Sequence, residues 1–260
     1  MGVLNVTPDS FSDGGTFFDP AAAIRRLAEI AGDGAAICDV GAESTRPGAA
    51  PVPAGEQLRR LRPVFAAVAS GCQVAISIDT SSAIVAKAAL DAGAVLVNDI
   101  TGGRGDPNLL PLVAERAVAV CLVHMQGDPR TMQRAPAYDD VTGDVAAFLE
   151  KRLAAAVAAG IPEAHVLLDP GIGFGKRLDD NLTLLRELPR LVALGRPLVI
   201  GVSRKSMFGQ LLGRDVDERM AGSLAAGLMA VDRGAAVLRV HDIRETVDAI
   251  EVWQAVRGVG

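Results

Sequence analysis

Eight short apolar runs, rich in Val, Ile and Leu, recur along the chain and alternate with longer segments whose apolar residues fall at helical spacing. The runs lack the every-second-residue alternation of a half-exposed strand, so we expect strands covered on both faces, as in a parallel sheet. The expected strands are residues 2–6, 36–40, 74–78, 95–98, 118–123, 165–168, 197–202 and 236–240. The expected helices are residues 20–33, 55–70, 81–92, 107–115, 139–159, 179–194, 217–233 and 243–256.

The length of 260 residues matches one closed barrel of eight βα units, which typically needs ~250 residues. The alternatives are two smaller domains or an open doubly wound sheet, which usually has fewer strands and often a Gly-rich first turn. The first turn here, NVTPDSFSDGG, lacks G-x-G-x-x-G, and no linker or low-complexity stretch divides the chain. We therefore predict an α/β fold, a single-domain (β/α)8 TIM barrel over residues 1–260, with its active site at the C-terminal ends of the strands.

Charge and hydropathy exclude several classes of partner. The 26 Lys and Arg against 31 Asp and Glu give a net charge of -5, so no overall basic field attracts nucleic acid or an acidic membrane. No apolar run approaches the roughly 18 residues of a transmembrane span, and no signal-type segment follows Met1. We expect a cytoplasmic protein that binds neither nucleic acid nor membrane. Cys38 and Cys121 lie in apolar runs, as inert core thiols do, so neither zinc nor a disulfide framework is expected.

Polar residues end nearly every expected strand, at the positions where barrel enzymes carry their chemistry. A single Asp, Asn or Ser there is equally well explained as the cap of the next helix, but eight polar ends together favour a site. Carboxylates follow the second, third and sixth strands, and cations follow the seventh and eighth. The polar ends are Asn5, Asp39 with 43–46, Asp79, Asn98 with Asp99, His124, Asp169, 203–206, and Arg239 with His241 and Asp242.

This separation of charge predicts a substrate with two unlike ends. Closure of the barrel places the cations of the last two strands beside Asn5, where they suit a phosphate group. The carboxylates of Asp79 and Asp169, with the amide of Asn98, suit a heterocycle that presents an amidine-like N–H edge. The residues themselves therefore predict a phosphorylated nitrogen heterocycle as substrate.

Two other features admit alternative interpretations. The segment DPGIGFGK could cradle a phosphate, but it lacks the Walker spacing, so we favour a tight turn with Phe174 in or beside the pocket. Ser203, His241 and Asp242 could form a Ser-His-Asp triad, but the sequence lacks a nucleophile elbow. His124 and His165 are too scattered to predict a metal site.

Taken together, the strand ends form a set of motifs that occur in one order along almost the whole chain: GVLNVTPDSFSDGG, DVGAESTRPG, SIDT, VNDITGG, HMQG, DPGIGFGK, GVSRKS and RVHD. The set closely resembles the dihydropteroate synthases, the folate-pathway members of the pterin-binding barrel family. The resemblance implies a transferase that condenses 6-hydroxymethyl-7,8-dihydropterin diphosphate with 4-aminobenzoate to give dihydropteroate and pyrophosphate. It also implies Mg²⁺, a homodimer and inhibition by sulfonamides. Family members usually carry a short lead-in before the first strand, which this sequence lacks.

The resemblance implies a role for the residues of each motif. The pterin would be held by Asp79, Asn98, Met125, Asp169, Phe174 and Lys205. The diphosphate would be held by Asn5, Arg239 and His241, and Mg²⁺ by Asn5 and Asp13. The 4-aminobenzoate would be held by Phe11, Thr45, Arg46, Pro47 and Ser206. The catalytic residues would be Asp79, Asp169, Lys205, Arg239 and His241.

The family's mechanism is dissociative, so diphosphate leaves first and the arylamine attacks a cation at the exocyclic methylene. Two rivals remain. One is a pterin-barrel methyltransferase that uses methyltetrahydrofolate; it would not need the SRKS, RVHD and TPDSFSD segments. The other is a non-catalytic pterin-binding paralogue, which loss of Asp13, Arg46, Lys205 or Arg239 would have favoured.

Overall fold

The computed structural model describes residues 1–7, 20–44 and 48–258. The strands in this part of the chain are β1 (Gly2–Asn5), β2 (Ile37–Gly41), β3 (Ala75–Asp79), β4 (Leu96–Asp99), β5 (Ala119–Val123), β6 (Val166–Asp169), β7 (Val199–Ile200) and β8 (Val237–Leu238). The helices are α1 (Pro20–Gly32), α2 (Ala54–Ala69), α3 (Ala83–Ala92), α4 (Leu109–Arg116), α5 (Val141–Ala158), α6 (Leu178–Arg186), α7 (Leu188–Val192), α8 (Ser206–Leu212), α9 (Met220–Asp232) and α10 (Ile243–Arg257). Two 3-10 turns, η2 (Glu163–His165) and η3 (Val216–Glu218), precede β6 and α9.

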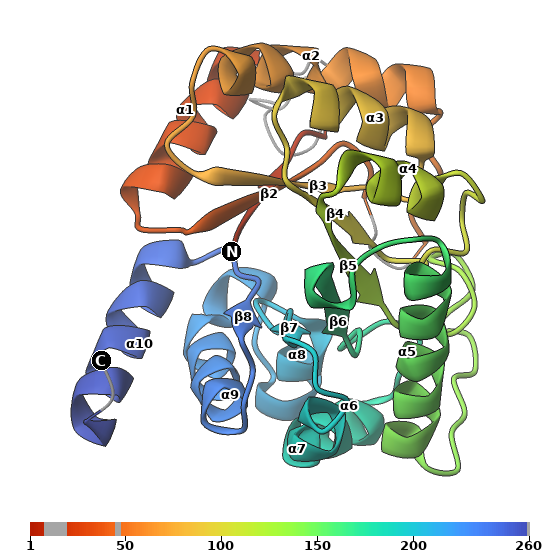
Figure 1. Cartoon of the computed structure of the whole chain (residues 1–260). Coiled ribbons are helices and arrows are strands. Elements are labelled where there is room, and N and C mark those ends of the chain that lie inside the picture. The colour runs from red at the N-terminus through yellow and green to blue at the C-terminus, as the bar shows by residue number, and fades with distance from the viewer. Residues whose placement is uncertain (8–19, 45–47, 259–260) are drawn as a thin grey trace.

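The strands form a closed ring of parallel strands (Figure 1). β1 to β6 pair in chain order, and β7 pairs with β8. Parallel bridges between Leu168 and Leu198 and between Gly2 and Val240 join these two groups on both sides. At the second junction, the Val3 amide donates to the Val240 carbonyl at 3.0 Å. The predicted (β/α)8 barrel is confirmed.

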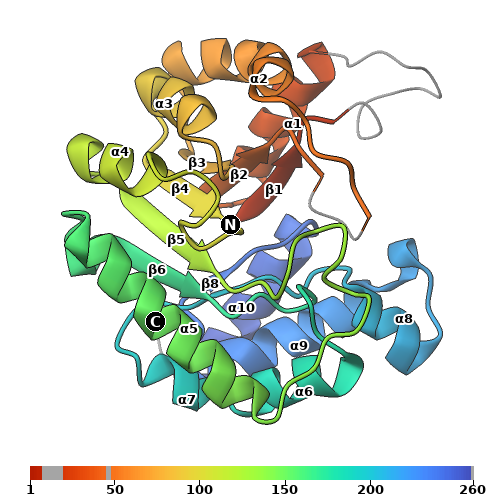
Figure 2. The ribbon, with the colours of Figure 1, turned by 90° about the vertical axis from the view of Figure 1, so that its right-hand side faces the viewer.

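Two apolar layers hold the barrel, one inside the ring and one outside it. Partners in register on neighbouring parallel strands point to the same face, and Asn98 of β4 is in register with Cys121 of β5. Cys121 packs with Leu96, Val123 and Val199 in a small inner cluster. A larger cluster lies between the strands and the surrounding helices, which flank the ring on both sides in Figure 2. The inner face is therefore free to carry polar side chains toward the C-terminal ends of the strands.

Two helical segments differ from the expectation. The helix expected over residues 179–194 is two helices, α6 and α7, because Pro189 stands in the first turn of α7, where a missing N–H is tolerated. After β7, an additional helix, α8, precedes the expected one; it ends at Gly213, whose φ of 67° is left-handed. This extra helix begins directly after Lys205 and so helps to fix that residue at the mouth of the barrel.

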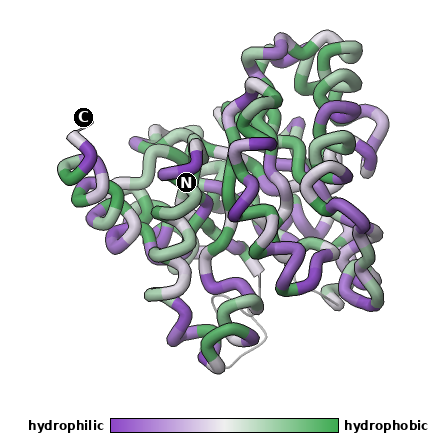
Figure 3. The backbone as a smooth tube through the Cα atoms, turned by 90° about the horizontal axis from the view of Figure 1, so that it is seen from below, coloured by the Kyte–Doolittle hydropathy of each residue, from purple (hydrophilic) through white to green (hydrophobic). Residues whose placement is uncertain are grey.

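Other expectations concern the surface and the thiols. Hydrophobic and hydrophilic residues are mixed along the projecting α10 (Figure 3). Among the described residues, no helix has the length and apolar character needed to cross a membrane. Cys38 and Cys121 are free and buried, as predicted for core thiols.

Candidate active site

One pocket gathers residues from the C-terminal ends of β3, β4, β5 and β6 and from the segments that follow β4, β6, β7 and β8. Five of the six residues predicted to hold a pterin line it. The sixth, Met125, is buried directly after β5. The lining residues are Asp79, Asn98, Ile100, Val123, Asp169, Ile172, Phe174, Gly201, Lys205 and Arg239.

Arg239 links two carboxylates in the wall of this pocket. Its Nε donates to Asp39 Oδ2 at 2.7 Å, and its Nη2 donates to Asp79 Oδ2 at 2.8 Å. Asn98 Nδ2 donates to the same Asp39 oxygen at 3.0 Å. The sequence placed Arg239 with His241 at the diphosphate; the structure places its guanidinium among the predicted pterin residues, and its contact with a diphosphate stays a prediction.

Two oxygen atoms of this hydrogen-bond network have no donor among the described residues. Asp39 is fully buried, and its Oδ1 has no hydrogen-bond partner among the described residues; the same holds for Asn98 Oδ1. A buried acceptor without a donor is costly. Asn98 lines the pocket, so this acceptor without a donor belongs to a residue of the pocket wall.

Burial sets the protonation of the charged residues in the pocket. It raises the pKa of Asp79 to about 7, although the guanidinium of Arg239 opposes the shift. Burial also raises the pKa of Asp169, against the hydrogen bond from Gly171. It lowers the pKa of Lys205 to about 8, against the attraction of Asp169. Burial disfavours charge on Arg239 too, but Asp39 and Asp79 outweigh it and raise the pKa of that guanidinium. Two groups of the pocket thus titrate near neutral pH.

The loop after β6 is the tight turn predicted for DPGIGFGK. Asp169 Oδ1 accepts a hydrogen bond from the Gly171 amide at 2.6 Å. Gly171 has a φ of 66°, and a Cβ there would lie 1.9 Å from the carbonyl oxygen of His124, so glycine is required. Phe174 then lies in the pocket, with Lys205 Nζ 4.4 Å from its ring centroid. The prediction of a tight turn that brings Phe174 into the pocket is confirmed.

His241 and Ser203 contact each other but do not belong to a catalytic triad. His241 Nδ1 lies 3.0 Å from Ser203 Oγ, and the same hydroxyl accepts from the His241 amide at 3.1 Å. The carboxylate of Asp242 instead accepts hydrogen bonds from Nε and Nη2 of Arg204. Burial, reinforced by Arg239 and Arg204, lowers the pKa of His241 to about 4. The imidazole is therefore neutral at neutral pH and is oriented by Ser203.

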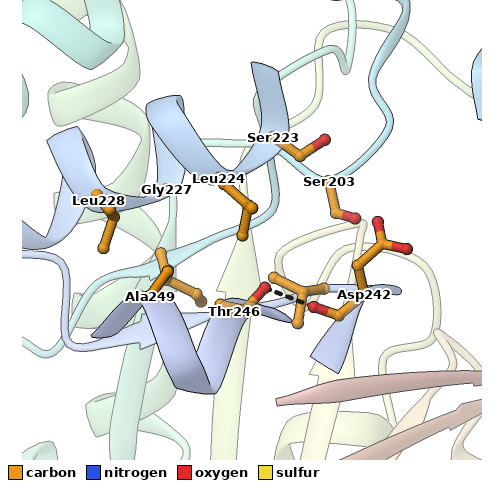
Figure 4. A pocket seen from close by; sticks show the side chains of 10 residues that line it. Ser203, Ser223, Leu224, Gly227, Leu228, Asp242, Thr246 and Ala249 are labelled. Carbon is orange, nitrogen blue, oxygen red and sulfur yellow. Dashed lines mark hydrogen bonds between the residues drawn. The ribbon is translucent and has the colours of Figure 1, made fainter. Parts of the chain in front are cut away.

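The turn between β7 and α8 holds an unusual backbone conformation at Arg204, whose φ is 56°. Its amide donates to Ser223 Oγ at 2.9 Å, which helps to stabilise this left-handed residue. Behind the turn, a second pocket lies between α9 and α10 (Figure 4), and it shares no lining residue with the first. Leu224 and Leu228 line it from α9. The strained residue separates Ser203 from Lys205 and thereby directs the two side chains to different neighbours.

Several predicted residues lie elsewhere or outside the described part of the chain. Asn5 is half-buried at the end of β1, and Ser206 is the exposed first residue of α8. Within residues 1–7, 20–44 and 48–258, no three His, Cys, Asp or Glu side chains group as metal ligands. The predicted residues outside the described ranges are Phe11, Asp13, Thr45, Arg46 and Pro47.

Sequence reasoning assigned no role to two buried charged residues of the site, Asp39 and Lys176. Asp39 interrupts the apolar run of β2, and a carboxylate inside such a run signals a buried ion pair. Lys176 ends the DPGIGFGK turn and is 3% exposed. Nothing in its neighbouring sequence distinguishes it from a surface lysine.

Comparison with known proteins agrees with this geometry. Residues 1–241 match the family model described as pterin binding enzyme. The dihydropteroate synthase of Escherichia coli (strain K12) is 48% identical over 255 residues, which cover 98% of this chain and 90% of that protein.

Two solved structures cover nearly the whole chain. The dihydropteroate synthase of Xanthomonas albilineans with 4-aminobenzoic acid superposes with a TM-score of 0.93 at 48% identity, covering 100% of this chain and 93% of its own. The Yersinia pestis enzyme in a sulfonamide drug complex has a TM-score of 0.93 at 45% identity, covering 99% and 94%. The chain belongs to the dihydropteroate synthases, within the family of pterin-binding enzymes.

Proposed function

We propose that the pocket lined by Asp79, Asn98 and Asp169 binds the pterin ring of 6-hydroxymethyl-7,8-dihydropterin diphosphate, which the chain condenses with 4-aminobenzoate. The observation that carries this proposal is the set of oxygen acceptors on one wall, of which Asn98 Oδ1 is buried without a donor among the described residues. An amidine-like ring edge supplies N–H groups to such a wall. Phe174 and Ile172 add apolar surface for the ring.

The charges of the pocket suit a dissociative reaction. As diphosphate leaves, positive charge develops on the pterin, and the buried carboxylates of Asp79 and Asp169 stabilise it. The neutral His241, oriented by Ser203, can donate a hydrogen bond to the departing group. The attacking arylamine is weakly basic, so no strong general base is needed. Preorganised charge thus supplies most of the catalysis.

We propose that Mg²⁺ enters with the diphosphate. Asn5 offers an amide oxygen, a donor that Mg²⁺ accepts, and phosphate oxygens and water can complete its coordination shell. Asp13, the other predicted ligand, lies outside the described residues. When bound, the ion neutralises charge on the leaving group.

We propose a cytoplasmic homodimer. Its support is a patch of large apolar side chains that are exposed where α8, η3 and α9 follow one another. Isolated exposed apolar residues are common, but these four all lie within residues 211–220, which favours an interaction surface there. The patch consists of Leu211, Leu212, Val216 and Met220.

The function is tested by mixing the protein with the pterin diphosphate, Mg²⁺ and 4-aminobenzoate. We expect pyrophosphate and dihydropteroate to appear in equal amounts, and only when all components are present. If the protein binds phosphate-free pterin but forms neither product, that result would favour the non-catalytic paralogue. Methyl transfer from methyltetrahydrofolate would favour the methyltransferase.

The activity should depend on pH through two groups of the pocket. When Asp79 is protonated, one of its acceptor oxygens becomes an O–H donor and its negative charge is lost; its pKa is raised to about 7, so kcat/KM should fall as the pH drops below 7. The pKa of Lys205 is lowered to about 8, so kcat/KM should fall again as the pH rises above 8 and the ammonium is lost. Rates measured over a pH range of roughly two units on either side of these values test this. In Lys205→Arg, the fall of kcat/KM at alkaline pH should disappear. If kcat/KM of the parent protein stayed constant as the pH drops below 7, the proposed role of Asp79 would be contradicted.

Sulfonamides should inhibit by competing with 4-aminobenzoate. They share an arylamine with a polar group para to it, and the Yersinia pestis relative is described in a sulfonamide complex. Initial rates with both compounds varied test this. We expect the inhibitor to raise the apparent Michaelis constant for the arylamine substrate and to leave kcat unchanged. Inhibition that excess arylamine substrate cannot relieve would exclude a shared pocket.

A further inference from the structure

Lys176 is a buried lysine beside the pocket, and its Nζ has three hydrogen-bond partners. Its Nζ lies 2.8 Å from His124 Nδ1 and donates to the carbonyls of Gly171 and Phe174, each at 3.0 Å. An ammonium has three N–H donors, and here each has one acceptor. Within the described residues, no carboxylate lies within ion-pair distance of it.

The contact with Lys176 Nζ constrains the tautomer of the His124 imidazole. Burial lowers the pKa of Lys176 to about 7, against the attraction of Asp169. In the protonated state the ammonium has only donors, so His124 Nδ1 accepts and the ring is the neutral tautomer with its proton on Nε2. Burial, with the charge of Lys176, lowers the pKa of His124 to about 3, consistent with this state. The ring is also held edge-on by Phe148, at a centroid distance of 4.8 Å. His124 therefore gives Lys176 a fixed anchor at the end of β5.

The other two acceptors belong to the turn that forms one side of the pocket. Gly171 donates its amide to the catalytic candidate Asp169, and Phe174 places its ring beneath Lys205 Nζ. One ammonium thus binds both ends of residues 171–174 and ties them to a neighbouring strand. A buried charge without a counter-ion is expensive, so an uncharged residue would be the simpler way to fill this space.

We infer that Lys176 is a positioning residue, whose ammonium fixes the turn 171–174 against β5 so that Asp169 and Phe174 meet the substrate ring. The inference rests on the proposed pterin pocket. It gives a function to a lysine that does not touch the substrate. It also requires that loss of the N–H donors weakens pterin binding more than 4-aminobenzoate binding, because Ile172 and Phe174 of the turn line the pocket proposed for the pterin.

Lys176→Met tests the inference, since it keeps an unbranched apolar stem and removes the donors. Lys151→Met, the same change at an exposed position of α5, is the matched control. In Lys176→Met we expect weaker binding of phosphate-free pterin and a higher Michaelis constant for the pterin substrate, both by tenfold or more. The Michaelis constant for the arylamine substrate should change less than twofold. Lys176→Arg, which keeps N–H donors, should recover part of the loss.

Failure of the inference is distinguishable from failure of the proposed function. If the unaltered protein binds no pterin, the pocket assignment is wrong. If it binds pterin and Lys176→Met binds equally well, or loses both substrates to the same extent, Lys176 has no specific positioning role.

A measurement on the unaltered protein covers the case in which Lys176→Met does not fold. The chain has three histidines, so ¹⁵N resonances of the imidazoles are readily separated. At a pH below the lowered pKa of Lys176, we expect His124 as the Nε2–H tautomer, coupled to a slowly exchanging ammonium that shifts when phosphate-free pterin is added. A His124 Nδ1–H tautomer, or an ammonium signal that pterin leaves unchanged, would overturn the inference.

Discussion

Arg239→Ala should lower the free energy of unfolding by about 3–5 kcal/mol, because it leaves buried carboxylates without their counter-ion. Asp39 is fully buried and Asp79 nearly so, and both accept hydrogen bonds from this one guanidinium. Urea unfolding at a pH above the raised pKa of Asp79 measures the loss. Synthase activity should fall with it, since Asp79 loses the partner that holds it in the pocket wall.

Arg190→Ala is the control for this change. Arg190 also pairs with two carboxylates, Asp140 and Glu187, but all three side chains are exposed to solvent. Exposed ion pairs contribute about 0–1 kcal/mol, so the control should lose no more than that. If Arg190→Ala and Arg239→Ala lost the same free energy of unfolding, the buried ion pairs of Arg239 would stabilise the protein no more than exposed ones.

Asp169→Asn should weaken the binding of phosphate-free pterin roughly 5- to 150-fold, the equivalent of about 1–3 kcal/mol. Asp169 Oδ1 is occupied by the Gly171 amide, and Oδ2 has no hydrogen-bond partner among the described residues. Asparagine can keep the bond to Gly171, but it then presents an NH₂ group to a ring edge that also donates. Calorimetric titration of phosphate-free pterin measures the change.

Asp179→Asn, in the exposed first turn of α6, makes the same chemical change outside the pocket and should leave pterin affinity unaltered. The affinity of Asp169→Asn for the arylamine substrate should also stay within about twofold of the parent. If Asp169→Asn bound pterin as tightly as the parent protein, Asp169 could not accept a hydrogen bond from the ring.

Much of the fold could be predicted because the strands of a parallel barrel are buried on both faces and appear as continuous apolar runs. The break between α6 and α7 was missed, since the apolar spacing continues through residues 179–194 while Pro189 starts a new helix. The short α8 was missed because its seven residues contain too few turns for a periodic pattern. The first error concerns a helix boundary, and the second concerns a helix too short to show a periodic pattern.

The candidate site was predictable to the extent that it lies at the strand ends. Closure of the barrel brings Asp79, Asn98 and Asp169 to one pocket without any further information. The pairing of Arg239 with Asp39 could not be predicted, because the two residues are 200 positions apart and both point into the ring. Lys176 could not be predicted either, since its burial depends on how the turn after β6 packs against the end of β5.

The most direct test is a crystal structure of this protein with phosphate-free 6-hydroxymethylpterin. We expect the ring in the pocket between β3, β4 and β6, with N–H groups within hydrogen-bond distance of Asp79, Asn98 and Asp169. Phe174 should contact the ring, and Arg239 should keep its bonds to Asp39 and Asp79. A ring bound elsewhere, or bound here with none of its N–H groups directed at these three side chains, would contradict the assignment of the pocket.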